Sequence, residues 1–149
     1  MKIKNIFSGL SVLIIDSDIL NFLVLSALLD ETGITVLHAE SSSEAVDFFD
    51  LDTPVDFIIS DVNPDNLKAI KYIQNKQPDI PVFLQKQISN KNLLIPEQIL
   101  YNQIFTGTPA KDDFILMITN HLKTSNHYTD NVNTQNKKNL VSVEYTNIK

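Results

Sequence analysis

Cysteine and arginine are both absent from this chain of 149 residues. Without cysteine there is no disulfide framework, no thiolate metal site and no catalytic thiol. Without arginine there is no bidentate grip on phosphate and no arginine finger. The apolar run 12–15 is cut off by Asp16 and Asp18 too early for a signal peptide, and no run is long enough to cross a membrane. We therefore expect a cytoplasmic protein that does not contact membranes.

The charge balance is acidic, with a formal net charge of −6 at pH 7. A surface of this sign repels nucleic acid, so we expect no nucleic-acid partner. The apolar fraction of 43% is enough for one packed core. From residue 124 the sequence becomes polar and rich in asparagine, which is typical of a linker. The pattern predicts one domain over residues 1–123 and a polar tail over 124–149.

Within the domain, short apolar runs rich in β-branched residues alternate with stretches of helical period. This alternation is typical of a parallel sheet covered by helices. The predicted strands are 12–16, 35–39, 56–60, 81–85 and 103–106, and the predicted helices are 19–31, 42–51, 64–77, 96–101 and 111–123. They predict an α/β fold of the flavodoxin-like, doubly wound type with strand order 2-1-3-4-5.

Three positions set helix boundaries. Ser41 with Glu44 forms a capping box at the start of the second helix. Gly33 follows the first helix where a left-handed residue is expected. Pro96 fits only the first turn of a helix, so the helix 96–101 is short and its region is mostly loop.

Polar residues follow several predicted strands at their carboxyl ends. They are Asp16, Asp18, Asp61, Lys86 and Thr108. Functional groups of parallel α/β sheets gather at this edge, so we expect these side chains near one another. Two facing carboxylates there would bind a hard cation such as Mg²⁺ or raise the pKa of one of them. Either outcome marks a functional cleft.

Four segments together resemble the receiver domain of two-component response regulators. They occur in the expected order and spacing between about residues 10 and 122. The segments are VLIIDSD at 12–18, DFIISDV at 56–62, PVF at 81–83, and Phe105 followed by Thr108-Pro109.

The resemblance implies a phosphorylation site. Asp61 corresponds to the carboxylate that takes a phosphoryl group from a histidine kinase or phosphotransfer protein. The phosphorylated domain of this family then signals to a downstream protein. Asp16 and the backbone carbonyl of Asn63 correspond to ligands of the Mg²⁺ that neutralises the phosphoryl oxygens. Phe105 is similar to the aromatic residue that changes rotamer on activation, although a Phe there is as often plain core.

Three residues depart from the family pattern. Ser17 stands where a second acid is usual; it can hold a metal only through water, so we expect Mg²⁺ to bind weakly. Lys86 replaces a hydroxyl residue, and Thr108 replaces a lysine. The ammonium of Lys86 either pairs with Asp61 or Asp16, or points to solvent. The chain is thus expected to be a non-enzymatic signalling protein, phosphorylated on Asp61 or acting as a pseudo-receiver that docks a partner without phosphorylation.

An enzyme is the alternative. The motif around Asp16 also resembles the nucleophile motif of haloacid-dehalogenase-type phosphatases, in which Asp16 would be the nucleophile and Asp18 the acid/base. Such an enzyme needs a lysine, for which Lys86 is available, and a later acidic pair at a strand end. The adjacent acids Asp112 and Asp113 fall inside the last predicted helix instead.

The end of the tail alternates again. Val141, Val143 and Tyr145 would share one face of a strand over 140–146. We expect this segment to pair with an open sheet edge, more readily in a second copy of the chain than in its own. A homodimer through the C-terminal segment is then expected. A tail that orders only on a partner is the alternative.

Overall fold

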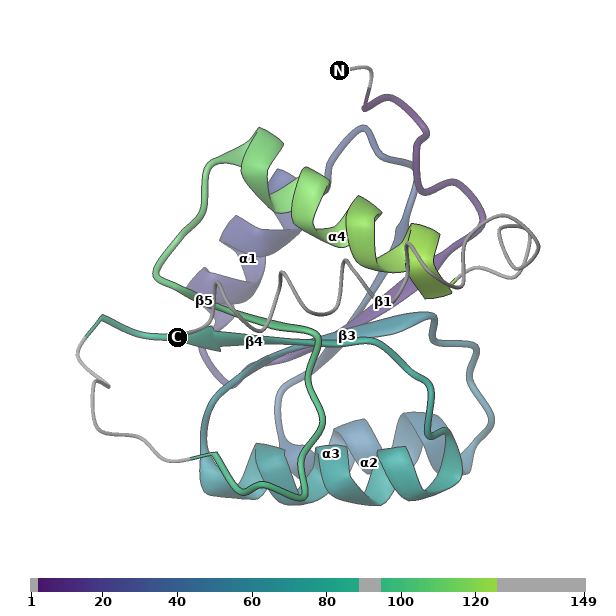
Figure 1. Ribbon diagram of the computed structural model, residues 1–149, viewed down its shortest axis with the longest axis vertical. Coiled ribbons are helices and arrows are strands. Elements are labelled where there is room, and N and C mark those ends of the chain that lie inside the picture. The colour runs from purple at the N-terminus through teal and green to yellow at the C-terminus, as the bar shows by residue number, and fades with distance from the viewer. Residues whose placement is uncertain (1–2, 89–94, 126–149) are drawn as a thin grey trace.

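Five parallel strands form one sheet in the order β2-β1-β3-β4-β5 (Figure 1). The structure is a computed structural model that describes residues 3–88 and 95–125. Its elements in chain order are β1 (Ser11–Ile15), α1 (Ile19–Leu28), β2 (Thr35–Ala39), α2 (Ser42–Asp50), β3 (Phe57–Asp61), α3 (Pro64–Lys76), β4 (Val82–Lys86), β5 (Gln103–Thr106) and α4 (Lys111–Ser125). The predicted flavodoxin-like sheet is confirmed.

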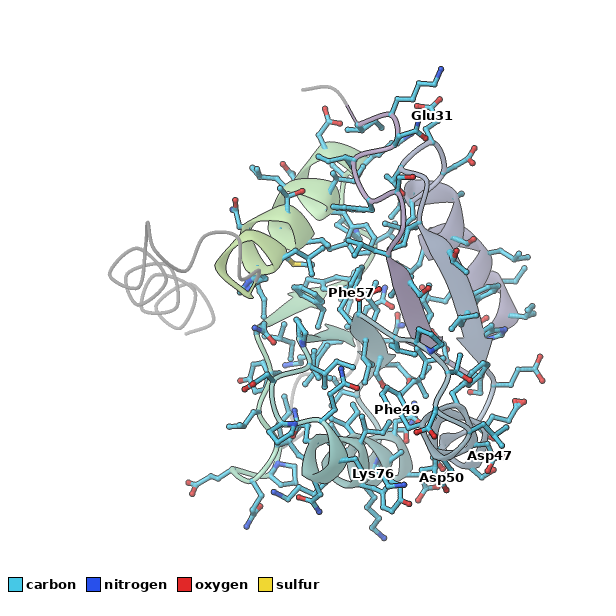
Figure 2. The ribbon with its side chains drawn as sticks, turned by 90° about the vertical axis from the view of Figure 1, so that its right-hand side faces the viewer. Glu31, Asp47, Phe49, Asp50, Phe57 and Lys76 are labelled. Carbon is cyan, nitrogen blue, oxygen red and sulfur yellow. The ribbon has the colours of Figure 1, made fainter. Side chains whose placement is uncertain are left out.

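Two helical layers cover the sheet, with α1 and α4 on one face and α2 and α3 on the other (Figure 1). On the α1/α4 side, Ile14, Phe57 and Phe83 are buried in one cluster. On the α2/α3 side, Leu13 and Ile58 belong to a second cluster. Strands buried on both faces read as continuous apolar runs, which is why the sequence pattern located them. Figure 2 shows Phe57 between the layers.

Side-chain alternation along β3 and β4 decides which residues face the site. Asp61 is paired in register with Gln85, not with Lys86. Gln85 therefore shares the α1/α4 face with Phe83, two residues earlier, and Lys86 projects toward the α2/α3 face. A glutamine thus stands beside Asp61 on the face where an apolar side chain would continue the core.

An ion pair and a hydrogen bond join the ends of α2 and α3 on the outside of that layer. The Lys76 ammonium lies 2.6 Å from Asp50 Oδ1, and the Tyr72 hydroxyl donates to the same oxygen at 2.8 Å (Figure 2 labels Asp50 and Lys76). The hydrogen bond from Lys76 lowers the pKa of Asp50 below its ordinary value. Because both side chains are well exposed, this pair aligns the helices more than it stabilises them.

The short helix expected over 96–101 is not formed. Residues 95–101 contain a single turn in which Ile99 N donates to Pro96 O at 3.0 Å. Ile99 is buried in the α2/α3 cluster, so the segment covers the core as a loop. Proline at its start and the short length leave too few hydrogen bonds for a helix. The fifth helix of the expected arrangement is therefore α4.

The starts of the four helices are reproduced, whereas their ends differ from the expected residues 31, 51, 77 and 123. Ser41 Oγ accepts from Glu44 N at 3.2 Å, which is the first hydrogen bond of a capping box, whereas Glu44 Oε2 accepts at 3.2 Å from Glu40 N, one residue before the N-cap. The helix α1, however, ends at Leu28, with Leu29 as its C-cap in a right-handed conformation. Gly33 does have a positive φ of 80°, but it lies in the turn that leads into β2.

None of the helices among residues 3–88 and 95–125 is long and apolar enough to cross a membrane. Residues 126–149 lie outside the described residues. The strand over 140–146 and the homodimer that it would form therefore stay predictions.

Two glycines with positive φ provide a matched test of packing. A Cβ at Gly33 would lie 3.2 Å from Asn5 Oδ1 and 3.2 Å from Ser8 Cα, whereas a Cβ at Gly9 would meet nothing within 4 Å. Both substitutions to alanine incur the left-handed backbone penalty of about 1–2 kcal/mol. We expect Gly33→Ala to lower the free energy of unfolding more than Gly9→Ala in urea titrations. Equal losses would contradict the close contact at Gly33.

Candidate functional site

Asp16 follows β1 directly and is 3% exposed. Its Oδ1 accepts from Asp18 N at 2.8 Å, and its Oδ2 accepts from Asn21 Nδ2 at 2.5 Å. Its backbone carbonyl lies 2.8 Å from His38 Nε2, and the His38 ring stacks on Phe22 with centroids 3.8 Å apart. The buried carboxylate is therefore hydrogen-bonded on both oxygens, as a charge away from water requires.

Asp61 ends β3 and is half-buried. Its Oδ1 accepts from Asn66 Nδ2, and Asn63 Nδ2 lies 3.4 and 3.3 Å from its two oxygens. Asn63 is also the N-cap of α3 and accepts from Asn66 N at 2.8 Å. The first turn of α3 thus supplies both side-chain amides that contact Asp61.

The two carboxylates interact with one another. Burial raises the pKa of Asp61 above its ordinary value, and the negative charge of Asp16 raises it further. The hydrogen bonds from Asn66 and Asn63 act in the opposite direction but do not cancel the rise. The expected pair of facing strand-end carboxylates is therefore present in Asp16 and Asp61.

A second pair of amides, Asn21 and Gln85, connects Asp16 to strand β4. Asn21 Nδ2 donates to Gln85 Oε1 at 2.6 Å, and Gln85 Nε2 lies 3.3 Å from Asn21 Oδ1. Gln85 Nε2 also donates to Gly107 O at 3.1 Å in the loop between β5 and α4. Sequence reasoning missed both residues. A usable signal was present, because Gln85 is a polar residue inside the buried strand PVFLQK.

Lys86 does not pair with either acid. The salt bridges among residues 3–88 and 95–125 are Lys76 with Asp50 and Lys111 with Glu31. The expected ion pair of Lys86 is wrong, because the alternation of β4 turns this side chain to the opposite face from Asp61.

The remaining expected site residues are Ser17, Thr108 and Phe105. Ser17 and Thr108 are exposed near the site, and no hydrogen bond ties either side chain to the acids within the described part of the chain. Phe105 is half-buried and packs edge to face on Phe114 of α4, with ring centroids 5.6 Å apart. In this conformation Phe105 is part of the core on the α1/α4 side.

The residues present do not fit a magnesium site. Mg²⁺ needs free carboxylate oxygens and tolerates little departure from octahedral geometry. Here N–H donors point at the carboxylates of Asp16 and Asp61, and Ser17 adds no charge. The described ranges hold no cluster of three or more acidic, histidine or cysteine side chains that could hold a metal.

The phosphatase alternative gains no support from this geometry. Its nucleophile Asp16 is buried, with both oxygens occupied by donors. Its acid/base Asp18 is the N-cap of α1 and accepts from Leu20 N and Asn21 N. Asp112 and its neighbour lie in the first turn of α4 rather than at the end of a strand.

Comparison with known proteins places the fold. No family model matches the chain, and no curated protein matches it. A response regulator receiver domain from Clostridium thermocellum superposes with a TM-score of 0.63 at 21% identity, over 76% of this chain and 94% of that one. The signal receiver domain of an HD domain-containing protein from Pseudomonas fluorescens Pf-5 gives 0.69 at 17% identity, over 78% and 96%.

A response regulator receiver protein from Sinorhizobium medicae matches in the same way, with a TM-score of 0.62 at 15% identity over 80% of this chain and 98% of that one. The chain has the receiver-domain fold. The resemblance drawn from the four sequence segments is therefore confirmed for the architecture, in which Asp61 closes the third strand of the receiver sheet.

Replacing Asp61 by asparagine should stabilise the protein at neutral pH. The raised pKa means that folding favours the neutral form, so the ionised carboxylate reduces stability once the pH exceeds that pKa. We expect Asp61→Asn to raise the melting temperature at pH 7, and the gain to vanish as the pH falls below the ordinary value of 3.8. Melting curves across this range, with Asp79→Asn at an exposed turn as control, provide the measurement. A loss of stability at pH 7 would contradict the repulsion between Asp61 and Asp16.

Proposed function

We propose that this protein is a receiver-type module of two-component signalling that docks a partner protein without itself taking a phosphoryl group. The observation that carries the proposal is the state of the acid pair. Asp16 and Asp61 accept hydrogen bonds from neutral amides, and the salt bridges of the described residues lie elsewhere. The site surrounds the two carboxylates with neutral N–H donors, rather than with cations that could neutralise a phosphoryl group.

The electrostatics support this reading. A phosphoryl group on Asp61 would add negative charge beside Asp16, whose charge already opposes ionisation of Asp61. Stabilising that charge requires a cation or several strong donors close to the new oxygens. Lys86 faces the other side of the sheet, and Thr108 carries no charge. Ser17, Lys86 and Thr108, the three residues that depart from the family pattern, therefore do not compensate the added charge.

Helix α1 provides a surface suited to docking. Its outward side carries large apolar side chains that are between 41% and 70% exposed, namely Ile19, Leu20, Leu23 and Val24. Patches of this kind mark protein contacts more often than free surface. Exposed acids stand at both ends of the helix, at Asp18, Asp30 and Glu31. We expect the partner to present an apolar helical face flanked by lysine or arginine. A histidine kinase, a phosphotransfer protein and a downstream signalling protein are all candidates.

Phosphorylation of Asp61 is the second candidate. The half-buried side chain at the end of β3 favours it, because Oδ2 has only the long 3.3 Å contact with Asn63. An attacking oxygen is therefore still accessible from the solvent side.

Acetyl phosphate and beryllofluoride, each with Mg²⁺, separate the two candidates. We expect the intact mass to stay unchanged after acetyl phosphate, and backbone amide shifts around Asp61 to stay unchanged on beryllofluoride addition. A receiver domain with both metal-binding acids serves as the positive control. A mass gain of one phosphoryl group that Asp61→Asn abolishes would overturn the phosphorylation-independent role and establish the second candidate.

A further inference from the structure

Neighbouring groups fix the orientation of the side-chain amides of Asn21 and Gln85. Gly107 O can only accept, so it must face Gln85 Nε2, which leaves Gln85 Oε1 to accept from Asn21. Asn21 Nδ2 then lies between two acceptors, Gln85 Oε1 at 2.6 Å and Asp16 Oδ2 at 2.5 Å. Turning either amide around would bring oxygen against oxygen. The partial positive charge of Asn21 Nδ2 is therefore held against the Asp16 carboxylate.

The pair is largely shielded from water, with Asn21 itself half-buried. Gln85 is 2% exposed and Asp16 is 3% exposed. A buried acceptor without a donor destabilises a protein strongly, and a buried charge does so more. In a water-excluded site, a fixed dipole stabilises a nearby charge more than it does in solvent. Asn21 and Gln85 thus provide part of the stabilisation that Asp16 would otherwise take from water or a cation.

We propose that the Asn21–Gln85 pair replaces the divalent cation at this strand-end site, so that the domain adopts this hydrogen-bonded arrangement without metal. The inference deepens the proposed phosphorylation-independent role and rests on it. The geometry explains how the Asp16 carboxylate stays buried without a cation beside it. It also makes Asn21 and Gln85 positioning residues that link β1, α1, β4 and the loop after β5.

Carboxylate substitutions test this replacement directly. Asn21→Asp places an oxygen where Nδ2 now donates to Asp16, and Gln85→Glu removes the donor to Gly107 O. Either variant creates a third carboxylate near Asp16 and Asp61, which is a set that Mg²⁺ can bind. We expect both variants to melt several degrees lower than the wild type in EDTA. Millimolar Mg²⁺ should recover much of that loss, and the recovery should saturate.

Gln74→Glu is the matched control. Gln74 is also buried, and its amide donates to Leu100 O at 2.5 Å and accepts from Leu100 N at 3.3 Å. Its hydrogen bonds are to backbone, without either acid of the site. The same change of amide to carboxylate should therefore lower the melting temperature without any recovery in Mg²⁺.

The wild-type protein provides a second readout that does not depend on a variant folding. Its melting temperature should be the same in EDTA and in Mg²⁺. The side-chain amide protons of Asn21 and Gln85 should exchange slowly and keep their NMR shifts when Mg²⁺ is added. Saturable stabilisation of the wild type by Mg²⁺, fast exchange of these amide protons, or recovery of the two site variants no greater than that of Gln74→Glu would each overturn the inference.

These measurements use no phosphoryl donor, so their failure is distinguishable from failure of the proposed function. Mg²⁺ binding by the wild type without a mass gain from acetyl phosphate would overturn the amide replacement alone. A mass gain on Asp61 would overturn the phosphorylation-independent role, whatever the melting curves give.

Discussion

Repulsion between the carboxylates of Asp16 and Asp61 is the constraint on which the arrangement of the site depends. The parallel sheet brings the ends of β1 and β3 together, because these strands are neighbours in the order β2-β1-β3-β4-β5. Both acids therefore meet at one edge, partly out of water, where like charges interact strongly. Side chains of α1 and α3 offset this repulsion by donating hydrogen bonds. Asn21 donates to Asp16, and Asn66 donates to Asp61.

Most of the fold could be predicted from the sequence, but fewer of the contacts in the site could be. The three central strands were predictable because each is an apolar run buried on both faces, such as Phe57–Asp61 with its fully buried Ile58 and Ile59. The helix over 96–101 did not form because this short segment, with proline at its start, has too few hydrogen bonds for a helix. Asp16 and Asp61 were placed correctly because strand ends can be read from the pattern.

The contacts of the site were harder to predict for two physical reasons. A shift of one residue along β4 exchanges the faces of its side chains, so Lys86 was expected where Gln85 lies. The bond between Asn21 and Gln85 joins residues 64 positions apart, a contact that propensity and motif spacing do not encode. The two side chains meet only in the folded structure, where Asn21 in the first turn of α1 reaches Gln85 in β4.

Neutral amides give the site a different kind of control from a metal or a phosphoryl group. A cation exchanges with solution and a phosphoryl group can be added or removed, whereas Asn21 and Gln85 are fixed in the chain. Asn21 lies on α1, whose neighbours Leu20 and Leu23 point outward and are more than half exposed. A partner that covers this face contacts the helix that also holds Asp16. Under the proposed function, the docking surface and the hydrogen bond from Asn21 to Asp16 therefore belong to the same helix, α1.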